Sequence, residues 1–94
     1  MATIRRLVLD ILKPHEPPMV EVTEALADLE GVSGVNSTLI EVDEEVKNLK
    51  ITMEGEIDED EVRKTVKEKG ASVHSVDEVV AGEKTVEKIE TPQD

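Results

Sequence analysis

Hydrophobic and polar residues alternate in several short stretches of this chain, and the first stretch holds the longest apolar run. Within residues 4–13, Leu7, Leu9 and Ile11 fall on one side of an extended chain. The intervening positions also hold aliphatic residues, so neither side of this stretch is a plain solvent surface. We therefore predict a strand over residues 4–13, placed at the centre of a sheet and ended by a proline-rich loop.

Two further stretches place apolar side chains at helical spacing. Residues 18–30 carry an aliphatic stripe, open with a proline that suits a first helical turn, and are followed by Gly31 as a left-handed terminator. The second predicted helix has the clearest start signal, because Asp58 and Glu61 have the spacing of a capping box. Its first turn is acidic and lysines lie toward its other end, where Gly70 terminates it.

The remaining apolar stretches predict three more strands, over residues 35–43, 46–55 and 72–80, of which the first two form a hairpin. The order βαββαβ indicates an α+β fold, the ferredoxin-like sandwich: a four-stranded antiparallel sheet with two helices on one face. We expect the strand order 4-1-3-2, with strand one parallel to strand three. Residues 1–82 form this domain, and residues 83–94 are a polar tail with little apolar content.

The sheet face away from the helices is left uncovered in this arrangement. It would carry Arg6, Val8, Leu12 and Thr52, with part of strand two. A half-apolar uncovered face is typical of an interface. The chain has only 94 residues and no aromatic side chain, so self-association would add stability to a thin core. We therefore expect a homo-oligomer.

Charge and composition limit the kinds of molecule that this chain could bind. The chain has 23 acidic and 11 basic residues, a net charge of −12, which argues against nucleic acid and anionic membranes and favours cations. The absence of cysteine excludes disulfides and thiolate zinc sites. The first apolar run is too short to span a bilayer, and no signal-peptide cleavage site follows Arg5 and Arg6, so we expect a cytoplasmic protein.

One candidate site follows from the loop after strand one. In the predicted topology His15 and Glu16 approach His74, with Glu56 and Asp58 on the same rim. Imidazoles with carboxylates suit Zn²⁺, whereas carboxylates alone suit Ca²⁺ or Mg²⁺. The alternative is that the histidines are simply solvated, because an isolated histidine beside an acid is a weak motif.

Asp10 is a second candidate, because an acidic side chain inside a central strand is costly unless it is paired or lies at an interface. It is either part of a ligand site with His15 and Glu16, or an ion-pair partner of Arg6 or Lys50.

Acidic residues at the far end of strand four are the last candidate metal ligands. Asp77 and Glu78 should lie near Arg5 and Arg6, where ordinary cross-strand ion pairs are the alternative to a ligand role. The acidic turn 43–45 is expected at that same end and has no EF-hand spacing. The candidate metal ligands are together Asp10, His15, Glu16, His74, Asp77 and Glu78.

Three segments of the chain resemble a small archaeal family of uncharacterised proteins, a domain of unknown function: residues 7–17, 29–36 and 73–82. The resemblance covers about residues 4–86. It implies a ferredoxin-like fold and ring-like or otherwise higher homo-oligomers, and it supplies no activity or catalytic residue. The fold also resembles the ACT domains, which bind amino acids between paired sheets, but the loop after strand one lacks their glycine.

The sequence thus predicts a homo-oligomeric binding or regulatory module that takes a divalent cation or small ligand at acidic side chains. Two alternatives stay open: a small metal-assisted enzyme that uses His15 and His74, and a purely structural assembly protein. No glycine-rich loop follows strand one, so a phosphate cradle is not expected.

Overall fold

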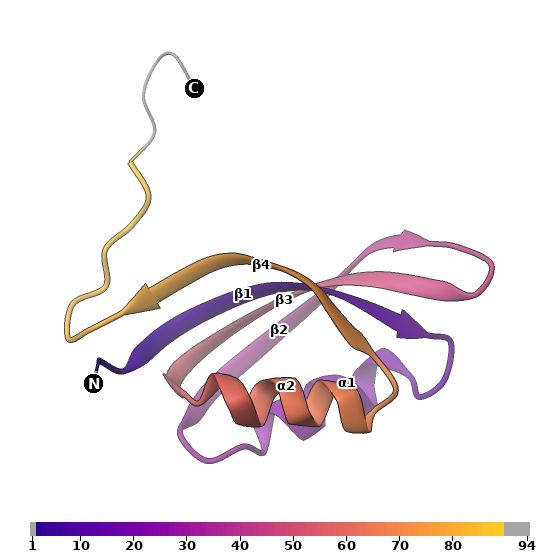
Figure 1. Cartoon of the computed structure of the whole chain (residues 1–94), viewed down its shortest axis with the longest axis horizontal. Coiled ribbons are helices and arrows are strands. Elements are labelled where there is room, and N and C mark those ends of the chain that lie inside the picture. The colour runs from indigo at the N-terminus through magenta and orange to yellow at the C-terminus, as the bar shows by residue number, and fades with distance from the viewer. Residues whose placement is uncertain (1, 90–94) are drawn as a thin grey trace.

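The strand β1 (Ile4–Pro14) occupies the centre of the sheet, as its apolar residues on both faces predict (Figure 1). The computed structural model describes residues 2–89. Its six elements follow the predicted order and confirm the ferredoxin-like α+β fold. The other five are α1 (Met19–Ala27), β2 (Val32–Val42), β3 (Val46–Ile57), α2 (Glu59–Glu68) and β4 (Ser72–Ala81).

The strand order is β2-β3-β1-β4, which is the predicted order read from the opposite edge. The predicted direction of one strand pair is wrong, because β1 runs antiparallel to β3 and not parallel. Each helical crossover makes the two strands that it joins parallel, β1 with β2 and β3 with β4. The β2–β3 hairpin then reverses the chain, so β3 enters between β1 and β2 in the opposite direction.

Both helices lie on one face of the sheet, and the core lies between the two layers (Figure 1). Alternate residues of β1 and β3 point into this core, where Leu9 and Ile51 have no more than 1% of their surface exposed. Helix α1 contributes Val22 and Leu26, and helix α2 contributes Val62 and Val66. Aliphatic side chains therefore fill the core without any aromatic residue.

Helix α2 begins as predicted. The Asp58 carboxylate accepts hydrogen bonds from the backbone N–H groups of Asp60 at 3.0 Å and Glu61 at 3.3 Å. Helix α1 is shorter than the predicted 18–30, because i to i+3 hydrogen bonds replace helical ones after Ala27 and Gly31 adopts φ +88°. Strand β2 consequently begins at Val32, three residues before its predicted start.

Candidate functional site

The antiparallel pairing of β1 and β3 separates residues that were predicted from the sequence to lie at the same end of the sheet. Pro14, at the end of β1, is opposite Val46, at the start of β3, so the loop after β1 lies beside the β2–β3 turn. His15 confirms this placement, because its Nε2 lies 2.9 Å from the backbone oxygen of Glu44. The acidic turn 43–45 is therefore at the His15 end of the sheet, and its predicted place near Arg5 and Arg6 is wrong.

Glu56 and Asp58 were predicted on the same rim as His15, and that prediction is also wrong. They flank Ile57, which is opposite Ile4 at the start of β1, so they lie at the other end of the sheet. Glu56 there lies 3.7 Å from Arg5, between Oε1 and Nη1.

Lys13 holds the loop after β1 through hydrogen bonds, although it was not among the candidate residues predicted from the sequence. The Lys13 side chain is fully buried, and its Nζ donates to the carbonyl oxygens of Pro14 at 2.7 Å and Pro17 at 2.6 Å. The carbonyl oxygen of His15 lies farther away at 3.4 Å. Three carbonyl oxygens of one short loop therefore surround a cation supplied by the chain itself.

Burial lowers the pKa of Lys13, and the nearby charge of Lys47 adds to this effect, whereas Glu16 opposes it. Glu16 itself is exposed in the loop and precedes a cis peptide bond to Pro17. The sequence held a signal for Lys13, because it continues the inward alternation of Leu7, Leu9 and Ile11.

Asp10 lies on the open face of the sheet, the face without helices, and accepts a hydrogen bond from the side-chain amide of Asn48. Its predicted ion-pair partner Lys50 instead lies 2.9 Å from Asp77, between Nζ and Oδ2. The Ser75 hydroxyl and Lys50 together hold the pKa of Asp77 below its ordinary value. Asp77 is thus paired with Lys50, and not with the arginines of β1 as predicted.

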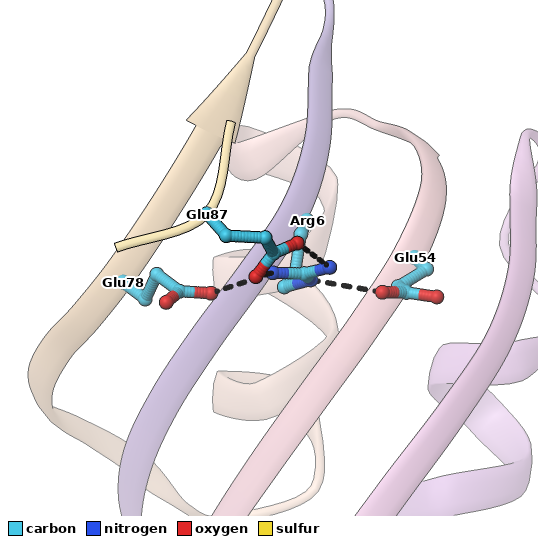
Figure 2. A network of polar contacts seen from close by, with 4 residues as sticks. All are labelled: Arg6, Glu54, Glu78 and Glu87. Carbon is cyan, nitrogen blue, oxygen red and sulfur yellow. Dashed lines mark hydrogen bonds and ion pairs between the residues drawn. The ribbon is translucent and has the colours of Figure 1, made fainter. Parts of the chain in front are cut away.

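Arg6 is the centre of the largest polar network on the open face (Figure 2). Its Nε lies 2.8 Å from Glu54 Oε2 on β3, and its Nη1 lies 3.2 Å from Glu78 Oε1 on β4, which is the predicted cross-strand ion pair. Glu87 completes the network with both carboxylate oxygens, Oε2 at 3.1 Å from Nη1 and Oε1 at 2.9 Å from Nη2.

These contacts raise the pKa of Arg6, chiefly through Glu87, and lower the pKa of Glu87. No local pattern in the sequence indicates the contact between Arg6 and Glu87, because the two residues are 81 positions apart. Glu87 falls in the segment that was predicted as a polar tail.

The predicted metal ligands are spread over the open face and its rim. Asp10, Asp77 and Glu78 lie on β1 and β4, His74 is exposed on β4, and His15 is exposed in the loop. Across residues 2–89, no three histidine or acidic side chains gather closely enough to hold a metal ion. A complete ligand set therefore does not form within the described part of one chain.

A hollow of about 440 Å³ lies on the helix side of the sheet, between the end of α1 and the start of α2. Acidic and aliphatic side chains line it, and none of the predicted ligand residues takes part. Its lining residues include Leu29, Glu30, Glu56, Asp58, Glu61 and Val62.

Neither helix of residues 2–89 has the length and apolar character needed to cross a membrane.

The fold and the open face define a class: small α+β sandwiches of ferredoxin-like topology with one bare sheet face. The model of the DUF211 family, described as uncharacterized ArCR, matches residues 5–94, and the chain belongs to this family. Uncharacterized protein MJ0319 of Methanocaldococcus jannaschii is 48% identical over 95 residues, which cover 100% of this chain and 98% of that protein. The resemblance to an archaeal family of unknown function is thereby confirmed.

Proposed function

We propose that this protein is a homo-oligomeric binding module in which copies of the chain complete one another's exposed sheet surfaces. The observation that carries the proposal is an aliphatic patch on edge strand β2. Leu39, Ile40 and Val42 expose 45%, 55% and 56% of their surfaces, where the β2–β3 hairpin extends beyond the helices (Figure 1). Aliphatic side chains on an edge strand favour pairing with another chain.

The open face supports the same proposal. Val8 and Leu12 of β1 are half-buried there, among the charged side chains of Arg6, Asp10 and Lys50. Apolar positions ringed by polar ones are typical of a protein interface. A chain this small without aromatic residues also gains stability when further aliphatic surface is covered.

The proposed ligand is a divalent cation, Ca²⁺ or Mg²⁺, bound by carboxylates of more than one copy. Asp10, Asp77 and Glu78 supply oxygen ligands on the open face, and hard divalent cations prefer such ligands. The net charge of −12 attracts cations and disfavours nucleic acid and anionic membranes as partners. No observation favours an enzyme that uses His15 and His74, since Nε2 of His15 already contacts the Glu44 carbonyl oxygen.

Native mass spectrometry tests the proposal with the variant Leu39→Lys/Val42→Lys. The matched control is Val20→Lys on helix α1, a valine that is 64% exposed and does not belong to strand β2. We expect multiples of the chain mass for the wild type and the control, and a larger single-chain fraction for the double variant. Equal assembly in all three proteins would contradict the role of the β2 patch.

Chelation separates assembly from cation binding. If carboxylates of neighbouring copies share a divalent cation, addition of EDTA should shift the wild-type distribution toward smaller species, and added Ca²⁺ or Mg²⁺ should restore it. An assembly that is unchanged by EDTA and contains no metal would overturn the cation part of the proposal and leave the assembly part standing.

A further inference from the structure

We propose that residues 82–89, here called the strap, fold back over the Arg6 end of the open sheet face and hold that end closed against a second copy of the chain. This inference rests on the proposed function, because it concerns the access of another copy to the same face. The strap follows β4 directly and contains the Glu87 carboxylate that binds Arg6.

The strap begins with a fixed turn. The Gly82 N–H donates to the Thr3 carbonyl oxygen at 2.8 Å, and the Gly82 carbonyl oxygen accepts from Arg5 Nε at 2.9 Å. Gly82 has φ +103°, a backbone conformation that glycine adopts without steric cost. Two hydrogen bonds to the start of β1 therefore set the direction in which the chain leaves β4.

The strap is then fixed a second time by Glu87. Its carboxylate meets the Arg6 guanidinium through two nitrogens, over the face of β1 and between Glu54 and Glu78 (Figure 2). This bidentate geometry restricts the orientation of the bound segment more than a single ion pair does. Only 18% of the Arg6 side chain remains exposed.

Between these two anchors the strap passes over β1. Thr85 of the strap lines a hollow of about 410 Å³ together with Ser33, Glu54 and Gly55, from β2 and β3, and with both arginines of β1. The strap thus reaches from the edge strand β4 across β1 toward β3. A second copy cannot lie flat on this end of the sheet while the strap is in place.

Charge adds to this steric effect. The open face carries Arg6 and Lys50 against four carboxylates, of Asp10, Glu54, Asp77 and Glu78. The strap itself carries no net charge, because Lys84 and Lys88 balance Glu83 and Glu87. Two identical acidic faces repel each other, so charge disfavours face-to-face contact of two copies whether or not the strap is docked.

The strap is held weakly enough to be displaced. The Glu87 side chain is 64% exposed, and an exposed ion pair of this kind favours the closed form by about two- to fivefold. Arg6 keeps Glu54 and Glu78 as partners after Glu87 leaves, so opening does not strand a buried charge. The strap is therefore a reversible cover, and salt should favour its release.

The test compares Glu87→Gln with Glu83→Gln in the full chain. Both substitutions remove one negative charge from the exposed strap, and only the first removes the Arg6 contact. NMR order parameters of residues 84–88 report docking, and sedimentation velocity reports self-association. We expect Glu87→Gln to lower the order parameters and to tighten association about two- to fivefold per chain, with Glu83→Gln close to the wild type on both measures.

Three other results would contradict the docking of the strap, its role as a cover, or the proposed function. Equally low order parameters in the wild type and Glu87→Gln would show that the strap does not dock, whatever the oligomeric state. Reduced order with unchanged association of an assembling protein would overturn its role as a cover. If both proteins remain single chains at all concentrations, the proposed function fails, and the order parameters still decide whether the strap docks.

Discussion

Replacement of Lys13 by Met tests the most unexpected feature of the fold, the buried ammonium group inside the loop after β1. Methionine retains an unbranched side chain of similar length, so the aliphatic contacts of the stem are largely kept. It removes the donor to the carbonyl oxygens of Pro14 and Pro17, at 2.7 and 2.6 Å. The substitution therefore isolates the charged hydrogen bonds from the packing.

The expected loss in the free energy of unfolding follows from those two short hydrogen bonds. Hydrogen bonds to a charged group contribute about 1.5–3 kcal/mol each. Burial lowers the pKa of Lys13, which shows that desolvation of the ammonium group offsets part of the stabilisation from these hydrogen bonds. We therefore use the low end of the range for each bond. We expect Lys13→Met to reduce the free energy of unfolding by about 2–3 kcal/mol, because the loop carbonyls lose their partner. For a chain of this size that loss lowers Tm by roughly 10–20 °C.

The assay is calorimetry or urea unfolding of wild type, Lys13→Met and the control Lys47→Met. Lys47 is opposite Lys13 on β3, and its charge lowers the pKa of Lys13. Removal of the Lys47 charge should leave stability unchanged or slightly raised, because it relieves a repulsion. If Lys13→Met were as stable as the wild type, the loop would not depend on its ammonium group, and the reasoning would be refuted.

Three further predictions concern the fold. Asp58→Ala should lower the free energy of unfolding by about 1 kcal/mol, because helix α2 loses its N-cap; an unchanged urea midpoint would contradict this. Gly55→Ala should lower the thermal midpoint far more than Gly34→Ala, since Gly55 has φ +133° and a Cβ there would meet backbone atoms, whereas nothing lies within 4 Å of one at Gly34. The pKa of Asp77 in the folded protein lies below its ordinary value, so the Asp77 carboxylate stabilises the fold above about pH 4 and loses this effect as the pH falls through the folded-state pKa. The difference in unfolding free energy between the wild type and Asp77→Asn should therefore shrink in acid, and a constant difference would argue against the Asp77 ion pair.

Local patterns were sufficient to predict the elements of the fold. The alternation of Leu7, Leu9 and Ile11 predicted the strand β1, the aliphatic residues on its other face placed it at the centre of the sheet, and the spacing of Asp58 and Glu61 marked the start of α2. The direction of β3 relative to β1 was predicted wrongly, because it depends on the whole path of the chain and not on any local pattern. That one error moved the acidic turn 43–45 to the wrong end of the sheet.

The candidate site was less predictable, because its contacts join distant parts of the chain. Glu78 pairs with Arg6 as the strand order requires, whereas Glu87 reaches Arg6 from a segment without secondary structure. Asp77 pairs with Lys50 and not with the arginines predicted for it, and Asp10 accepts from Asn48, because the register irregularities of β4 change which side chains meet. Such irregularities leave no clear mark on the hydrophobic pattern.

The central claim about this protein is that copies of the chain cover one another's exposed aliphatic surface. Sedimentation velocity of the wild-type protein, over a hundredfold range of concentration, measures this directly. We expect a species of several chains that persists on dilution and dissociates in the Leu39→Lys/Val42→Lys variant. A wild-type protein that sediments as a single chain throughout the range would contradict it.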